Sequence, residues 1–176
     1  MILSDFDLKW YIETERLKID PLFEDSIQQN GIDLHLAGEM KIPKSRKVFD
    51  LEKEVYSNPW YDSIISRELV TPPHRKVLCR TIEYIEMPLN LMGFCYLRST
   101  FARAGLSIPP TIVDAGFKGT LTVEIKGSEF PVKIYSKTPF MHLILMKLSS
   151  YAIPYKGKYQ GQFEVTPAIS DRIYKR

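Results

Sequence analysis

The chain has 176 residues, of which 44% are hydrophobic and 26% charged, and its formal net charge is +3 at pH 7. This length supports one sizeable hydrophobic core, so we expect a single domain over residues 1–176. Lys and Arg are spread along the chain, so the charge does not call for nucleic acid as a partner. No apolar run reaches the ~18 residues of a membrane span. The start also lacks a basic segment followed by an apolar one, so we expect a cytoplasmic protein without membrane contact.

The N-terminal residues carry a helix signal. Ser4 and Asp7 have the spacing of a capping box, and apolar residues then recur at helical intervals, which predicts a short helix over residues 5–14. Apolar and polar residues alternate over 17–19 and 32–36, which predicts two strands, the second after an Asn-Gly turn.

Residues 41–67 are the least patterned part of the chain. Charged residues alternate there with Tyr56, Trp60 and Tyr61, so we interpret the segment as a surface excursion. Its aromatic side chains form either an interaction patch or a small cluster beside the main core.

From Lys76 onward the sequence is typical of strands. Two β-branched and aromatic runs, 76–88 and 91–98, are joined by a connection too short for a helix, which predicts an antiparallel pair. Further strands are predicted over 121–126, 132–135 and 140–148, separated by Gly- and Pro-containing turns. Many short strands with little helix indicate a mainly β sandwich or barrel.

The two cysteines lie in strand-like apolar runs. Cys79 and Cys95 do not have the C-x-x-C spacing of zinc ligands, and the three histidines are scattered along the chain. The sequence therefore shows no zinc-site pattern, and no metal site is predicted. We expect buried free thiols in a reducing compartment.

Residues 98–124 hold the densest set of functional side chains. Arg98, Ser99, Thr100 and Arg103 are suitable donors for a polyphosphate, because guanidinium groups bind anionic oxygens two at a time. The alternative is an ordinary solvated helix start.

Two carboxylates in this stretch have open roles. Glu124 lies on a predicted strand, where it is either a solvated outer-face residue or a general acid and base with a fixed direction. Asp114 precedes Ala-Gly-Phe-Lys-Gly over 115–119, which predicts a tight hairpin turn whose backbone can approach a ligand closely. Asp114 either caps this turn or binds that ligand.

Three segments together carry a family resemblance. RSTFARAGL, VDAGFKGTLTVE and KYQGQ, in this order, resemble the signatures of the dCTP deaminase and dUTPase superfamily, especially its archaeal members. The resemblance covers about residues 14–36 and 76–163, and it leaves 41–67 outside as an insertion. It implies a distorted jelly-roll β-barrel that forms a homotrimer, with nucleotide sites at the subunit interfaces.

The resemblance also implies roles for the residues named above. Arg98, Ser99 and Thr100 match the segment that binds the phosphates and lines the reaction centre, and Arg103 matches the arginine beside the catalytic group. Glu124 matches the glutamate that takes a proton from the attacking water and returns it to the leaving amine.

The remaining matches concern the sugar and the triphosphate. Asp114 matches the aspartate that holds the deoxyribose 3′-hydroxyl, and Phe117 takes the place of the aromatic residue under the sugar. Lys158, Tyr159 and Gln162 match the flexible C-terminal lid, here 156–176, that folds over the triphosphate. Because this segment is polar and contains two glycines, it should make few apolar contacts, and we expect its removal to cost little stability.

The matches leave three functions open. Glu124 favours zinc-independent deamination of dCTP, with Mg²⁺ bound through the triphosphate. The segment 109–112, with its two prolines, and the short interval between Arg103 and Asp114 favour a dUTP pyrophosphatase or a bifunctional enzyme. A non-catalytic nucleotide sensor is the third possibility. We give the Glu124 carboxylate more weight than the loop at 109–112, and we therefore predict a dCTP deaminase.

Overall fold

The computed structural model describes residues 1–44, 48–51 and 60–170, and strands dominate them. The elements, in chain order, are α1 (Asp5–Glu13), β1 (Lys18–Asp20), β2 (Ile27–Gln28), β3 (Gly31–Pro43), β4 (Tyr61–Ile65), β5 (Glu68–Thr71), β6 (Lys76–Thr81), β7 (Tyr84–Glu86), β8 (Leu91–Leu97), α2 (Ser99–Arg103), β9 (Thr111–Val113), β10 (Lys118–Gly119), β11 (Thr122–Lys126), β12 (Val132–Tyr135) and β13 (Pro139–Lys147). The mainly β prediction is confirmed. Within the described ranges, neither helix is long enough to span a bilayer.

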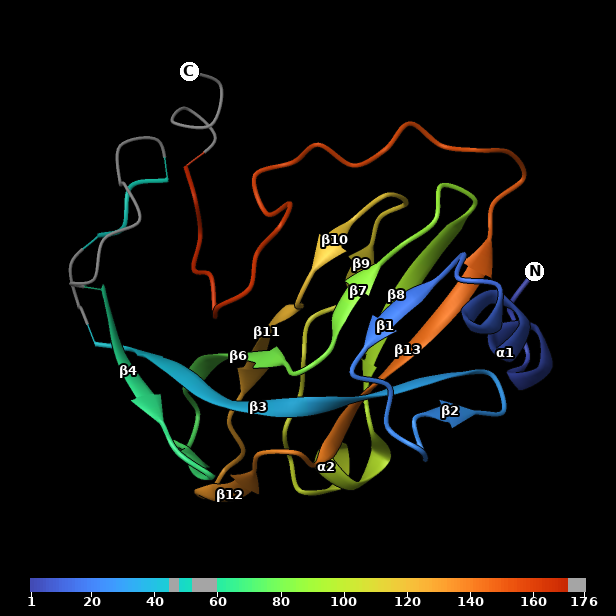
Figure 1. Ribbon diagram of the computed structural model, residues 1–176. Helices are drawn as coiled ribbons and strands as arrows, with labels where there is room; N and C mark the ends of the chain where they lie inside the picture. Colours follow the sequence, from blue (N-terminus) through green and yellow to red (C-terminus); the bar gives the residue numbers. More distant parts are fainter. Residues whose placement is uncertain (45–47, 52–59, 171–176) are drawn as a thin grey trace.

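The strands form one large curled sheet and two small ones. The large sheet has the order β11-β6-β3-β13-β8-β9, with β2 and β4 also paired to β3 (Figure 1). The small sheets are β1-β7-β10 and β12-β5. Buried side chains from the strands and from α1 form one hydrophobic cluster, which includes Leu8, Leu34, Val123 and Phe140.

The predicted N-terminal features are present. The side chain of Ser4 accepts a hydrogen bond from the backbone of Asp7, and the Asp7 carboxylate accepts one from the backbone of Ser4, which completes the capping box of α1. Strand β3 contains the predicted strand 32–36 but continues to Pro43. Cys79 and Cys95 are buried and free, and burial raises the pKa of both thiols to about 12, so they are unreactive.

Two predicted strand pairings are wrong. The run 76–88 divides into β6 and β7, and β7 pairs with β1 and β10, whereas β8 pairs with β13 and β9. Similarly, residues 115–119 form a turn but no hairpin, because β9 joins the large sheet and β10 a small one. A short connection fixes how close two strands are, but it does not fix the partner to which each one bonds.

The segment 41–67 is more regular than expected at both ends. Its first residues continue β3, and β4 returns antiparallel to them with Pro43 opposite Tyr61. Trp60 packs edge-on against Phe49 with 5.1 Å between the ring centroids, in agreement with a small aromatic cluster. Tyr56 and the final residues 171–176 lie outside the described residues.

A buried carboxylate marks the break between β6 and β7. Glu83 is fully buried, and its two oxygens accept hydrogen bonds from the backbone N–H of His35 at 2.9 and 3.0 Å. The same carboxylate lies 2.6 Å from Nδ1 of His35. Burial raises the pKa of Glu83, and its hydrogen bonds act in the opposite direction. This contact joins the small sheet to the centre of β3.

Glu83→Ala should lower the free energy of unfolding by about 3–5 kcal/mol, because it leaves buried polar groups of His35 without their partner. Urea denaturation measures the loss, and Glu129→Ala is the control because the Glu129 side chain is 86% exposed. A loss below about 1 kcal/mol would show that this contact does not hold the two sheets together.

Candidate functional site

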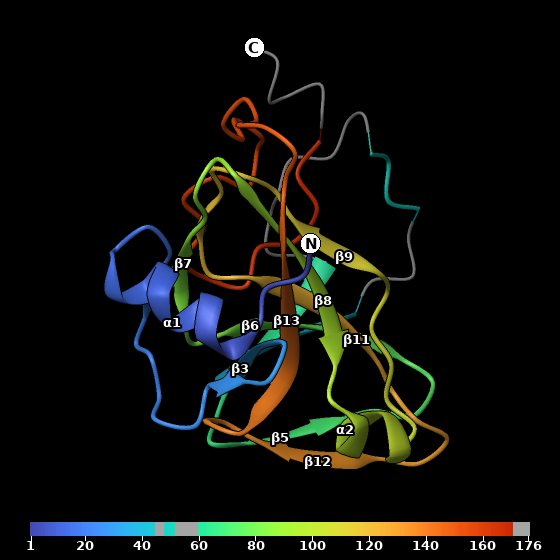
Figure 2. The same cartoon turned by 90° about the vertical axis from the view of Figure 1, so that its right-hand side faces the viewer.

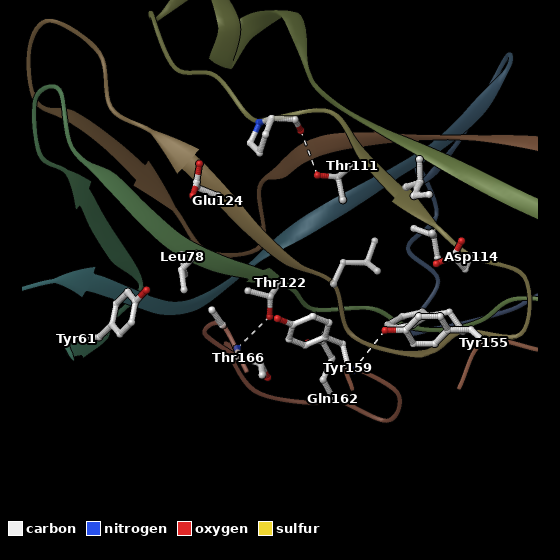
Figure 3. A pocket seen from close by; sticks show the side chains of 16 residues that line it. Tyr61, Leu78, Thr111, Asp114, Thr122, Glu124, Tyr155, Tyr159, Gln162 and Thr166 are labelled. Atoms are coloured by element: carbon white, nitrogen blue, oxygen red, sulfur yellow. Dashed lines mark hydrogen bonds between the residues drawn. The ribbon is translucent and has the colours of Figure 1, made fainter. Parts of the chain in front are cut away.

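One cavity brings together five of the residues that the sequence selected. It has a volume of about 470 Å³, a size typical of small-molecule sites. Its walls include Asp114, Phe117, Glu124, Tyr159 and Gln162 (Figure 3). These residues come from the turn between β9 and β10, from β11 and from the C-terminal segment, so the fold unites parts that are far apart in sequence.

Asp114 and Phe117 form one end of the cavity. They belong to a tight turn in which the backbone N–H of Phe117 donates to the carbonyl oxygen of Asp114 at 3.1 Å. Gly116 has a φ of +78° in this turn, a conformation that favours glycine. Phe117 is 6% exposed and packs against the ring of Tyr155, while Asp114 stays exposed. This end offers a hydrogen-bond acceptor beside an aromatic wall.

Glu124 lies toward the other end of the cavity. Val123 and Ile125 on β11 point into the core, so strand alternation directs Glu124 outward, where its side chain is 34% exposed. Its Oε1 lies 2.9 Å from Nζ of Lys76 on the paired strand β6. The carboxylate is therefore mounted on a rigid strand beside a cation, and it remains accessible from the cavity.

Lys76→Gln should lower the rate of the reaction catalysed in this cavity by at most about fivefold. The reason is that an exposed ion pair such as Lys76–Glu124 contributes up to about 1 kcal/mol of interaction free energy. The loss should fall on kcat rather than KM if Lys76 orients Glu124 without contacting the ligand. Lys133→Gln is the matched control, because it breaks a similar 2.9 Å pair with Glu68 away from the cavity. Equal kinetics in the two variants would remove Lys76 from the site.

The C-terminal segment forms the lower wall in Figure 3 and lies along β10 and the start of β11. The N–H of Gly161 donates to the carbonyl of Lys118 at 2.8 Å, and the N–H of Thr120 donates to the carbonyl of Gln162 at 2.9 Å. At Gly119 a Cβ atom would come within 2.8 Å of the Gln162 carbonyl oxygen, so glycine permits this close approach. The predicted lid is thus located at the cavity, and its mobility stays a prediction.

Gln162 also carries an unsatisfied polar atom. Its Nε2 donates to the carbonyl of Thr120 at 2.8 Å, while its buried Oε1 has no hydrogen-bond partner among the described residues. A buried acceptor without a partner costs free energy, so it indicates a position for a ligand donor. Lys158 does not line the cavity, and its Nζ donates to the carbonyl of Ile169 at 2.6 Å.

The predicted phosphate-binding group lies elsewhere on the chain. Arg98 precedes α2, and Ser99, Thr100 and Arg103 lie on this short helix, exposed to solvent. Figure 2 shows α2 beside β5 and β12 at one end of the molecule, away from the described part of the C-terminal segment. The Nε of Arg98 lies 3.2 Å from the buried carboxylate of Asp33, which fixes the direction of this guanidinium. Within one chain, the structure does not bring these four residues to the cavity.

Sequence reasoning missed several side chains near the cavity. Tyr61 and Thr166 line it, and Lys76 reaches Glu124 from β6. Thr122 also lines the cavity, and its Oγ1 accepts a hydrogen bond from the backbone N–H of Thr166 at 3.0 Å. No local signal identifies Tyr61 or Lys76, because both depend on strand register.

The cavity contains few candidate metal ligands. Within residues 1–44, 48–51 and 60–170, no group of three or more His, Cys, Asp or Glu side chains is close enough to hold a metal ion. The carboxylates of Asp114 and Glu124 therefore do not form a protein cage of the type that binds Zn²⁺.

Comparisons with known proteins agree with these features. The sequence profile of the family described as dCTP deaminase-like matches residues 2–148. A protein of Saccharolobus solfataricus named dCTP deaminase is 49% identical over 176 residues, covering 98% of this chain and 95% of the relative. One of Sulfurisphaera tokodaii with the same name is 50% identical over 169 residues, covering 94% of this chain and 91% of the relative.

A viral relative has a different name. The "Probable deoxyuridine 5'-triphosphate nucleotidohydrolase" of Sulfolobus islandicus rod-shaped virus 1 is 47% identical over 172 residues, covering 97% of this chain and 100% of the relative. Among solved structures, the 2'-deoxycytidine 5'-triphosphate deaminase of Agrobacterium tumefaciens superposes with a TM-score of 0.66 and 16% identity. The match covers 84% of this chain and 48% of that one, so this chain spans about half its length and shares its fold.

Proposed function

Because this chain belongs to the dCTP deaminase-like family, we propose that it is a hydrolase that deaminates dCTP to dUTP and ammonia without zinc. The observation that carries the proposal is the cavity that unites Glu124 with Asp114, Phe117 and Gln162. A carboxylate on a rigid strand faces the same space as groups suited to a deoxyribose, so one nucleotide can contact both ends.

The two ends of the cavity give the nucleotide a direction. The Asp114 carboxylate accepts a hydrogen bond from the 3′-hydroxyl, and Phe117 packs under the deoxyribose, where a ribose 2′-hydroxyl would be disfavoured. With the sugar at this end, the pyrimidine extends toward Glu124. The free Oε1 of Gln162 accepts a hydrogen bond from the bound nucleotide, and Tyr159 covers it from the tail.

The reaction then uses Glu124 as a proton carrier. The carboxylate takes a proton from a water molecule as the water oxygen bonds to C4 of the cytosine. It gives this proton to N3, then takes the proton of the new C4 hydroxyl and delivers it to the amino group, so that the C4–N bond breaks and ammonia leaves. The oxygen remains on C4, so dCTP and water give dUTP and ammonia. The neighbouring Lys76 keeps the carboxylate oriented between the two steps.

The phosphate-binding residues complete the site from a second subunit. Ser99, Thr100 and Arg103 are exposed on α2, Arg98 directly precedes this helix, and none of the four lines the cavity of its own chain. In a homotrimer they bind the triphosphate in a neighbour's cavity, where Ser99 and Arg103 also assist Glu124 at the reaction centre. Lys158 from the tail adds a positive charge near the phosphates.

Mixing two inactive variants tests this arrangement. Arg103→Ala and Glu124→Gln impair different surfaces, so a mixed trimer contains some sites with both residues intact. We expect activity to return after subunits of the two variants exchange, and light scattering to give the mass of a trimer. A fully active monomer, or no recovery in trimers that have exchanged subunits, would contradict a shared site.

Magnesium accompanies the substrate in this proposal. Without a cluster of three metal-ligand side chains in the described part of the chain, Mg²⁺ is held by the triphosphate oxygens, where it balances charge. Asp114 and Glu124 then remain available for hydrogen bonding and proton transfer.

A second function is supported by the viral relative and by Asp114. That relative carries the name of a dUTP nucleotidohydrolase, and Asp114 could also help to direct a water toward the α-phosphate. The enzyme would then release dUMP and pyrophosphate, alone or after deamination. A nucleotide sensor without catalysis is the third candidate, and it would bind dCTP and leave it unchanged.

The test is an incubation of purified protein with dCTP and Mg²⁺, with ammonia and the nucleotides measured together. We expect equal amounts of ammonia and dUTP. Ammonia with dUMP and pyrophosphate indicates the bifunctional enzyme, and turnover of dUTP alone indicates the pyrophosphatase.

A further inference from the structure

Charged side chains from two strands hold the C-terminal segment at Val165. The buried Lys41 ammonium on β3 donates to the Val165 carbonyl at 2.7 Å. The Glu39 carboxylate, two residues earlier on β3, accepts a hydrogen bond from the Val165 N–H at 3.3 Å and another from Nε of Arg80 on β6 at 3.1 Å. Both backbone polar groups of Val165 are therefore bonded to charged side chains, and its own side chain is fully buried.

These three side chains, which we call the charged clasp, also interact with one another. The Glu39 carboxylate lies between two cations, because Oε2 contacts Arg80 and Oε1 lies 4.0 Å from Nζ of Lys41. The side chains of Glu39, Lys41 and Arg80 are at most 20% exposed, so water competes little for these contacts. Arg80 also lies over the ring of Phe163, 5.6 Å from its centroid. The segment thus contacts the charged clasp at two positions.

The charged clasp lies beside wall residues of the cavity. Arg80 is the register partner of Thr122, and the Thr122 Oγ1 accepts a hydrogen bond from the N–H of Thr166 at 3.0 Å (Figure 3). Before the charged clasp, Nε2 of Gln162 donates to the carbonyl of Thr120 at 2.8 Å. Gln162, Thr122 and Thr166 all line the cavity. The contacts on both sides of the charged clasp therefore hold the segment against the cavity.

We propose that the charged clasp fixes residues 162–166 as a wall of the cavity before a nucleotide binds, which makes Glu39 and Lys41 positioning residues for Gln162. The inference rests on the proposed function, because that function gives Gln162 a contact with the nucleotide. A segment that is already ordered loses no further conformational entropy when the ligand arrives, so the charged clasp strengthens binding without contacting the ligand. This part of the segment then differs from the mobile lid that the family resemblance implies.

Hydrogen–deuterium exchange without nucleotide tests the fixed wall. In the wild-type protein, the amide of Val165 should exchange well below the rate of an unstructured chain. Lys41→Met removes the ammonium and keeps an apolar side chain, and it should raise this exchange by at least about tenfold, the effect of losing one hydrogen bond to a charged group. Lys44→Met is the matched control, because the Lys44 ammonium is 44% exposed and pairs with Asp62 at 2.8 Å.

Calorimetric binding of dCTP tests the positioning role in the Glu124→Gln background, where turnover is blocked. Lys41→Met should weaken binding by at least about threefold, because the nucleotide must then also order the segment. This loss should disappear when Gln162 is already replaced by Ala, whereas general damage to the fold would weaken binding in both backgrounds. Ammonia release by the wild-type protein is recorded separately. Because the exchange test uses no nucleotide, failure of the proposed function is distinguishable from failure of this inference.

Three results would overturn the inference. The first needs no substitution at the charged clasp: a Val165 amide that exchanges freely and becomes protected only after dCTP binds would make the segment a lid closed by the ligand. The second is equal exchange in Lys41→Met and Lys44→Met, because the charged clasp would then not hold the segment. The third is a loss of dCTP binding that is the same with and without the Gln162 side chain.

Discussion

Replacing Glu124 by Gln is expected to lower deamination by about 10²–10⁴-fold, the usual contribution of a positioned general acid and base. The amide keeps the size of the side chain and its place on β11, but it cannot accept a proton from water and return it to the leaving amine. Binding of dCTP should persist, because Asp114, Phe117 and Gln162 form their contacts without Glu124. Ammonia release and calorimetric binding measure the two effects.

Glu129→Gln is the control for this substitution. Its side chain is 86% exposed, and it does not line the cavity. We expect the control to retain wild-type kinetics and both variants to retain the wild-type melting temperature. Ammonia release by Glu124→Gln at a rate close to wild type would make Glu124 an ordinary residue of the outer strand face.

Truncation after Tyr155 should lower both the affinity for dCTP and its turnover. It removes Tyr159 and Gln162 from the cavity, and with them the wall that keeps bulk water from Glu124. We expect at least a tenfold loss in kcat/KM, equivalent to about 1.4 kcal/mol of transition-state binding. Loss of Lys158 should make part of this effect depend on salt.

The same truncation should also destabilise the protein, and here the expectation from sequence is corrected. Val165 in the tail is fully buried, and its carbonyl accepts a hydrogen bond from the buried Lys41 ammonium at 2.7 Å. Removing a buried valine costs about 1.5–3 kcal/mol. The melting temperature should therefore fall by several degrees, because each kcal/mol shifts it by about 2–4 °C in a domain of this size.

A point substitution separates the two effects of the tail. Gln162→Ala removes a cavity contact and leaves Val165 in place, so it should weaken dCTP binding with little change in melting temperature. Glu164→Ala is the control, because Glu164 is exposed on the same segment and does not line the cavity. Unchanged kinetics in both the truncation and Gln162→Ala would limit the tail to a structural role.

Local patterns predicted much of the fold. The capping box of α1 and the alternation in β11 and β12 depend on neighbouring residues, and these elements lie where the sequence indicates. Pairing partners could not be predicted in the same way. The buried Glu83 lies where the chain leaves the large sheet and enters a small one, and it bonds to His35 of β3. The sequence around a residue does not show which distant residue it will contact.

The site shows the same division. Asp114, Phe117, Glu124 and Gln162 were selected from motifs, and the structure unites them. Tyr61 was assigned to a surface excursion, because its place in the cavity follows from the register of β4 against β3. The sequence also could not predict that α2 lies away from the cavity. That position depends on how the strand β8 crosses the molecule and where it ends.

The central claim is that water oxygen is added to C4 of cytosine in this cavity. Turnover of dCTP in oxygen-18 water tests it directly, with mass spectrometry locating the label in the product. The account predicts one labelled oxygen on the base of dUTP and none on its phosphates. Label confined to the phosphates, or dCTP recovered unchanged, would contradict it.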